Sequence, residues 1–148
     1  MKGGERKLRA LLKLRAVARR QVTAAARTLA GLEQARGEAM RSLERLEAAI
    51  RTEETVALGR AEIGFRDFAA FLAGAAAKRE ALLQSCRSLD HEINGSREAL
   101  HAAEIERRKF DHLVDQVAAR RRANANKREV ALLDEAGRRG RGSRGARG

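Results

Sequence analysis

The stretch VTAAARTLAGLEQARGEAMRSLERLEAAI, residues 22–50, decides the fold. Nine positions in it recur at alternating spacings of three and four, and eight of them are apolar: Val22, Ala25, Leu29, Leu32, Arg36, Ala39, Leu43, Leu46 and Ile50. An apolar residue about every 3.5 positions over four heptads is typical of a coiled-coil seam, because this period keeps one helix face against a partner. We therefore predict a long helix over about 5–57. Upstream, Leu11, Leu14 and Ala18 join the stripe after one extra step of four, which predicts local unwinding.

A second seam starts at Phe65 and continues to Ala131. Fourteen of its twenty positions are apolar, and three of the six exceptions follow Val117: Phe65, Phe68, Leu72, Ala75, Arg79, Leu82, Cys86, Leu89, Ile93, Ser96, Leu100, Ala103, Arg107, Phe110, Val114, Val117, Arg121, Asn124, Arg128 and Ala131. This pattern predicts a second helix over about 66–136, whose last third has few seam residues.

The segment between the seams, LGRAEIG at 58–64, contains two glycines. Glycine lowers helix propensity by about 1 kcal/mol and tolerates positive φ, so we predict a reversal over about 58–65. The fold class is then all-α, a long antiparallel two-helix coiled-coil hairpin. Folding about this turn pairs residues whose numbers sum to about 123, and residues beyond about 119 extend past the first helix.

Two other topologies compete with this hairpin. Gly74 could form the reversal and equalise the helices, although it lies inside the helix-favouring stretch AGAAA at 73–77. Asn94-Gly95-Ser96 could break the second helix and give a three-helix bundle, although the seam crosses it in register from Ile93 to Leu100. A monomeric hairpin and an intermolecular coiled coil share the same seam, so the sequence leaves the oligomeric state open.

Composition and charge fit this architecture. The 148 residues include no proline, tryptophan or tyrosine and four phenylalanines, which leaves little bulk for an ordinary globular core. The net charge is +12, and it is concentrated at the chain ends: residues 1–20 carry +7, residues 118–148 carry +7, and the segment between them carries −2. A hairpin brings these cationic ends together. Residues 138–148, rich in glycine and arginine, are predicted to form a disordered basic tail.

The sequence predicts neither catalysis nor a cofactor. A pair of helices has no walled pocket, and the chain has no glycine-rich phosphate loop. His91, His101 and His112 have no second metal ligand at helical spacing, and Cys86, on the seam, is expected to act as a small buried hydrophobe. Acid–base pairs four residues apart, such as Glu5 with Arg9 and Glu47 with Arg51, are expected to support the helices from the solvent side. No apolar run is long enough to cross a bilayer and no secretory signal precedes the seam, which predicts a cytoplasmic protein.

Three stretches resemble one known family. They are LRALLKLRAVARRQVTAAARTLAGLEQA near the start, GFRDFAAFLAGAAAKREAL in the middle and NKREVALLDEAGRR near the end. Their order and the length of the chain are similar to those of the flagellar export protein FliJ and its virulence-system counterparts, the stalk proteins of type III secretion. The likeness spans about the whole chain. The sequence differs from the family in two respects: it lacks tyrosines around the turn, and it has a Gly/Arg tail that is not typical of the family.

The resemblance implies a non-enzymatic stalk in the pore of a hexameric export ATPase. It also implies contact with the cytoplasmic domain of the membrane export gate, help in handling export chaperones, and a place at the inner membrane. The residues implied to face the ATPase are Arg6, Arg9, Arg15, Arg19, Arg20, Arg120, Arg121, Arg122, Lys127, Arg128, Asp134 and Glu135. Those implied to face the gate are Phe68, Phe71 and Leu72. No small-molecule substrate is expected.

Other readings of the same residues stay open. The chain could be a nucleic-acid-binding coiled coil that uses its basic termini and the Gly/Arg tail, although it lacks aromatics for base stacking. Residues 5–20 could form a basic amphipathic helix on anionic lipid, although their leucines are more economically used against the second helix. The run Arg120-Arg121-Arg122 could be an ordinary solvated face, and Phe71, off the seam, could either contact a partner or broaden the core near the turn.

Overall fold

The computed structural model describes residues 2–59 and 62–145, and within them it contains two helices, α1 (Lys2–Leu58) and α2 (Glu62–Gly145). No strand occurs in either described range, so the all-α fold class is confirmed. The chain divides into two compact units to which both helices contribute. Unit 1 comprises Met1–Arg20 and Glu104–Gly148, and unit 2 comprises Gln21–Ala103.

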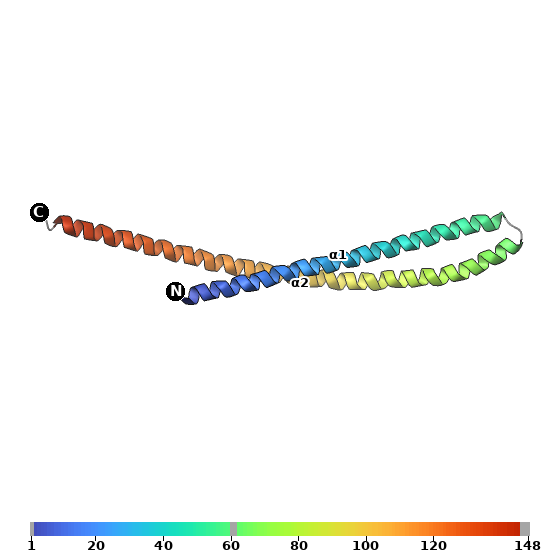
Figure 1. Cartoon of the computed structure of the whole chain (residues 1–148), viewed down its shortest axis with the longest axis horizontal. Coiled ribbons are helices and arrows are strands. Elements are labelled where there is room, and N and C mark those ends of the chain that lie inside the picture. Colours follow the sequence, from blue (N-terminus) through green and yellow to red (C-terminus); the bar gives the residue numbers. More distant parts are fainter. Residues whose placement is uncertain (1, 60–61, 146–148) are drawn as a thin grey trace. The chain divides into compact units, whose positions relative to one another are not determined.

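Unit 2 is an antiparallel helical hairpin in which α2 runs back alongside α1 (Figure 1). All nine predicted seam positions of residues 22–50 are buried or half-buried, which confirms the first seam. Leu43 and Ile93 are among its best-covered side chains, with 7% and 4% exposed. The Cys86 thiol is buried and lies 3.7 Å from the Met40 thioether sulfur, so it packs as a small hydrophobe as predicted.

The reversal is shorter than the sequence predicts. α1 continues to Leu58 and α2 begins at Glu62, so Gly64 lies inside α2 instead of in the turn. Gly59 does not have a positive φ, and no other described residue does. Its N–H donates to the Val56 carbonyl at 3.2 Å, an i to i−3 bond that tightens the end of α1 without a left-handed residue. Residues 60 and 61, also in the predicted turn, lie outside the described ranges.

Both alternative topologies are wrong. Gly74 lies in the interior of α2 beside Ala75, which is 3% exposed against α1. The segment 94–96 is helical, and Ile93 and Leu100 on either side of it are buried and half-buried. The seam therefore outweighs the local helix-breaking tendency of Asn-Gly-Ser, because burial of apolar side chains along a continuous face stabilises the helix more than a single glycine costs.

The start of the second seam differs from the prediction. Phe65 is 55% and Leu72 is 37% exposed, whereas Phe71, predicted to lie off the seam, is half-buried. This result agrees with Phe71 broadening the core near the turn. Arg79 is also exposed, and its guanidinium lies 3.7 Å from the Glu47 carboxylate on α1. From Leu82 to Val117 every predicted seam position is buried or half-buried.

In unit 1, the N-terminal part of α1 packs against α2 around Ala18 and Val114, which are 2% and 6% exposed. The covered positions of α1 are Leu8, Leu11, Arg15 and Ala18, which continue the three-four spacing without an insertion. The predicted extra step is therefore wrong, and Leu14 is 47% exposed. Arg15 occupies the seam position because its aliphatic stem covers apolar surface while its guanidinium reaches water.

The last part of α2 is exposed, although Arg121 still reaches the Glu5 carboxylate of α1. Every residue from 119 to 142 is exposed, which confirms that cover on the seam ends just after Val117. α2 nevertheless continues to Gly145, beyond the predicted helix end at about 136 and into the predicted disordered tail, whose residues 146–148 lie outside the described ranges. No proline ends the helix, and Glu135 pairs with Arg139 one turn later at 3.1 Å.

The register between the helices also differs from the prediction. Contacting pairs have residue numbers that sum to 126 or 130 instead of about 123, as in Glu47–Arg79 and Glu33–Arg97 of unit 2 and Glu5–Arg121 of unit 1. Side chains tilt toward the N-terminus of their own helix. In an antiparallel pair the α1 side chain therefore reaches away from the turn and the α2 side chain reaches back toward it, which raises the sum.

Candidate partner-binding surface

The two units differ sharply in charge. Unit 1 contains 21 basic and 8 acidic side chains, a net charge of +13, whereas unit 2 contains 11 basic and 12 acidic ones, a net charge of −1. Almost all of the excess positive charge of the chain thus belongs to the unit in which the two terminal segments pack together. This distribution marks unit 1 as the cationic surface on which a partner of opposite charge would be steered.

Asp111 links the two helices of unit 1. Its carboxylate accepts from the Arg19 guanidinium on α1 at 3.1 Å and from the Arg107 guanidinium on α2 at 3.2 Å. The Asp111 side chain is 25% exposed, so its carboxylate is better covered than those of the other ion pairs described here, such as Glu5–Arg121 and Glu47–Arg79. Arg107 occupies a seam position that faces α1. The Asp111 carboxylate, one turn later on α2, balances the charge of its guanidinium there.

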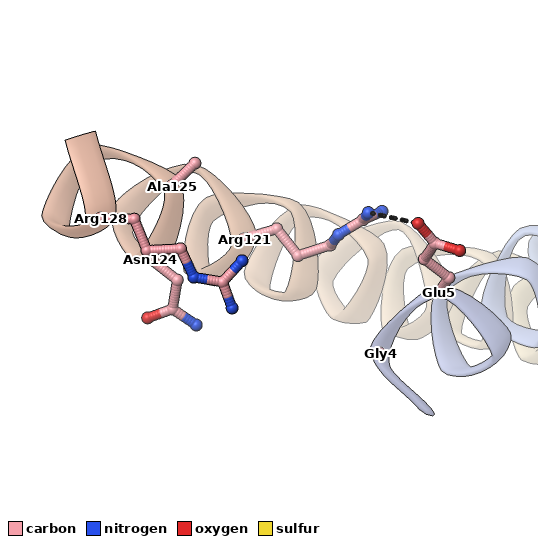
Figure 2. A pocket seen from close by; sticks show the side chains of 6 residues that line it. All are labelled: Gly4, Glu5, Arg121, Asn124, Ala125 and Arg128. Carbon is pink, nitrogen blue, oxygen red and sulfur yellow. Dashed lines mark ion pairs between the residues drawn. The ribbon is translucent and has the colours of Figure 1, made fainter. Parts of the chain in front are cut away.

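A groove of about 370 Å³ lies at the N-terminal end of α1, where that helix meets α2 (Figure 2). Its lining residues come from both helices: Gly4, Glu5, Arg121, Asn124, Ala125 and Arg128. Figure 2 shows the Arg121 side chain reaching along α2 to the Glu5 carboxylate, 3.7 Å away. Glu5 therefore pairs across the helices instead of with Arg9, and Glu47 does the same with Arg79 in unit 2.

All twelve residues implied to face the ATPase lie in unit 1. Eleven of them are exposed, and Arg15 is half-buried on the seam. Arg19, Arg121 and Glu135 are engaged in the ion pairs described above. The structure thus brings the two groups of sequence-predicted cations into one unit, while it uses part of them to hold α1 and α2 together.

The three residues implied to face the gate lie together near the start of α2 in unit 2. Phe68 and Phe71 are half-buried against the hairpin, and Leu72 is 37% exposed. Phe65, which the sequence placed in the seam, is more exposed than any of them, at 55%. At this end of the hairpin, Phe65 and Leu72 are therefore more accessible than Phe68 and Phe71.

Sequence reasoning missed the ion pairs between the helices. Several ion pairs join α1 to α2. In unit 1 they are Glu5–Arg121 and Arg19–Asp111, and in unit 2 they include Arg36–Asp90 and Glu33–Arg97. The last two border a groove of about 540 Å³ in unit 2. The sequence does show opposite charges flanking the two seams. These charges can be matched into ion pairs only once the register between the helices is known.

The described residues provide little for metal chemistry. They contain no group of three or more His, Cys, Asp or Glu side chains that would hold a metal ion. None of the helical residues in the described ranges forms a segment long and apolar enough to cross a membrane.

A helical pair with an excess of cations where its terminal segments pack defines a class of protein: a helical coiled-coil protein with a strongly cationic surface. The family model described as flagellar FliJ protein matches residues 6–145. The chain therefore belongs to the flagellar FliJ protein family, and its role is related to flagellar export. Searches of curated proteins and of solved structures find no significant match.

Proposed function

We propose that this protein is a non-enzymatic stalk and adaptor of a flagellar type III export apparatus. It couples a hexameric export ATPase to the membrane export gate and helps to handle export chaperones, in the cytoplasm at the inner membrane. The observation that carries the proposal is the concentration of +13 in unit 1 against −1 in unit 2, within a chain that belongs to the FliJ family. Opposite charges steer a cationic end toward an acidic ring while each surface contact stays weak.

Charge reversal in unit 1 tests the ATPase contact. Arg6, Arg9 and Arg20 are exposed, and none of them belongs to an ion pair described above. Replacing all three by glutamate is expected to weaken binding to the export ATPase by about tenfold or more at low salt, because like charges then meet across the interface. Binding and ATP turnover would be measured with the purified ATPase at several salt concentrations.

A matched control lies in unit 2. Arg27, Arg41 and Arg51 are also exposed, and their replacement by glutamate changes the net charge by the same amount. This variant is expected to bind the ATPase within about twofold of the original protein, because its changes lie outside the cationic unit. Equal losses in the two variants would show that only total charge matters, and the absence of any binding by the original chain would refute the stalk role.

The contact with the gate is proposed to be apolar and to use the start of α2. Leu72 and Phe65 provide accessible apolar surface there, and Phe68 and Phe71 support it from the hairpin. Replacing Leu72 by serine is expected to weaken capture of the gate's cytoplasmic domain with little dependence on salt. A loss that disappears at high salt would instead indicate an electrostatic contact.

Nucleic acid binding remains the second candidate, favoured by the charge of unit 1. Several phosphate contacts would give an affinity that falls steeply with salt and shows little sequence preference. The only aromatic side chain in unit 1 is Phe110, which is half-buried on the seam. A gel shift that survives 200 mM salt, a concentration at which phosphate binding weakens by orders of magnitude, would favour this function over the stalk.

A further inference from the structure

The exposed end of α2, residues 119–142, carries an apolar cluster in unit 1. Val130, Leu132 and Leu133 are 57%, 67% and 66% exposed within a single turn of helix. One exposed leucine is common on a protein surface, but several adjacent ones usually mark a contact. A helical segment whose side chains are all exposed is also only marginally stable in water, so a surface that covers it would stabilise it.

The side chains of this segment are separated by type around the helix. Successive residues are about 100° apart, so Val130, Leu132 and Leu133 share roughly one half of the circumference with Ala119, Ala123, Ala125 and Ala136. Basic residues follow both edges of this apolar half: Arg120, Lys127 and Arg138 on one side, and Arg121 and Arg139 on the other. Three charged residues, Arg122, Glu129 and Arg141, lie within the apolar half, and Asp134 lies among the basic residues at one edge.

This arrangement fits a flat anionic surface better than a groove or a second copy of the chain. A groove in a protein takes a narrow stripe of anchors spread over several turns, whereas here the large side chains occupy one turn and the apolar half is wide. A second copy would bring together two segments that each carry eight basic and three acidic side chains between residues 119 and 142. Their mutual repulsion opposes self-association.

We propose that residues 119–142 of α2 bind the surface of an anionic lipid bilayer. Val130, Leu132 and Leu133 enter the boundary between headgroups and acyl chains, and the flanking arginine and lysine side chains contact lipid phosphates. The long stems of these cations allow their charged groups to remain at headgroup level. Seven of the twelve residues implied to face the ATPase lie in this same segment, so the lipid contact and the ATPase contact are expected to exclude each other there.

Vesicle flotation tests the proposal with the full-length chain. The original protein is expected to float with vesicles of phosphatidylcholine and phosphatidylglycerol. Its affinity for vesicles of phosphatidylcholine alone is expected to be lower by about tenfold or more. The double substitution Leu132→Ser and Leu133→Ser is expected to reduce binding to the anionic vesicles by about tenfold, because it removes the groups that enter the bilayer. Both positions are exposed, so the variant's thermal unfolding is expected to match that of the original.

Leu58→Ser is the matched control, since Leu58 is 71% exposed but belongs to unit 2. It is expected to leave vesicle binding unchanged. Equal binding to neutral and anionic vesicles, or equal losses in the control and the double variant, would overturn the proposal. So would anionic binding that the serine substitutions do not alter, since it would show adsorption by the cations alone.

Hydrogen exchange provides a second measurement. Anionic vesicles are expected to slow amide exchange in residues 119–142 and leave that of residues 22–50 unchanged. Protection of this segment by RNA or by an acidic protein, with no protection by anionic vesicles, would assign the apolar cluster to a different partner and overturn the lipid contact.

Discussion

Replacing Asp111 by alanine tests whether the two terminal segments are held together in unit 1. This carboxylate joins Arg19 on α1 to Arg107 on α2, and its side chain is 25% exposed. The variant leaves Arg107, 35% exposed on the seam, without its carboxylate partner. This junction joins the two helices that form the cationic surface of unit 1.

The magnitude follows from exposure. The Arg107 pair is partly covered and is expected to contribute about 1 kcal/mol, while the Arg19 pair, with an arginine side chain that is 54% exposed, contributes about 0.5 kcal/mol. Alanine has a higher helix propensity than aspartate and offsets about 0.5 kcal/mol of this loss. The free energy of unfolding should therefore fall by about 1 kcal/mol.

Urea unfolding measures this loss, and hydrogen exchange locates it in residues 2–20 and 104–118. Glu80→Ala is the matched control, because it removes an ion pair to Arg87 whose side chains are 70% and 59% exposed. That pair contributes less than about 0.5 kcal/mol, so the control is expected to change stability little. Adding Arg107→Ala in a double-mutant cycle should show a coupling of about 0.5 kcal/mol or more. The reasoning is refuted if Asp111→Ala and Glu80→Ala lower stability equally, or if the coupling is absent.

Other predictions concern the core, the end of α2 and the oligomeric state. Leu43→Ala is expected to lower the free energy of unfolding by about 2–3 kcal/mol in urea, since Leu43 is 7% exposed, while Leu58→Ala changes it by less than about 0.5 kcal/mol. Without vesicles, amides of residues 119–142 should exchange much faster than those of residues 22–50, because every residue of that segment is exposed; equal protection would contradict this. Met40→Cys should form a disulfide with Cys86 under mild oxidation and yield a monomer on a non-reducing gel, because the two side chains meet within unit 2; a disulfide-linked dimer would instead indicate an intermolecular coiled coil.

Periodicity was sufficient to predict the helices and which faces meet. Every position of the repeat from Val22 to Ile50 is covered, because a coiled-coil seam requires apolar residues at a fixed spacing; flanking positions such as Ala35 and Met40 are half-buried as well. The same argument failed at Leu14, where the preference for a leucine over Arg15 suggested a shift of the stripe. Supercoil geometry fixes the seam over many turns, so one favourable residue beside the stripe does not displace it.

The register and the reversal depend on quantities that the sequence does not display. The sum rule treated paired residues as lying at the same level, and the tilt of side chains toward each N-terminus shifted the contacts from 123 to 126 or 130. Glu5 and Glu47 have suitable arginines four residues away on their own helices, yet both pair across the interface. Local spacing alone cannot distinguish these choices, because both satisfy the carboxylate and the difference in energy is small.

The sequence predicted which charged residues belong to the candidate surface, but not which of them pair with each other. Counting charges located the cations at the two chain ends, and packing α1 against α2 placed those ends in one unit with net +13. The acids in that unit are partly used against its own arginines: Glu5 holds Arg121 and Asp111 holds Arg19. Each such pair removes a cation from partner contact while it fixes the position of its neighbours. The remaining exposed cations are therefore displayed on a surface whose spacing is set by the helical pair, and an acidic partner can be recognised by that spacing as well as by total charge.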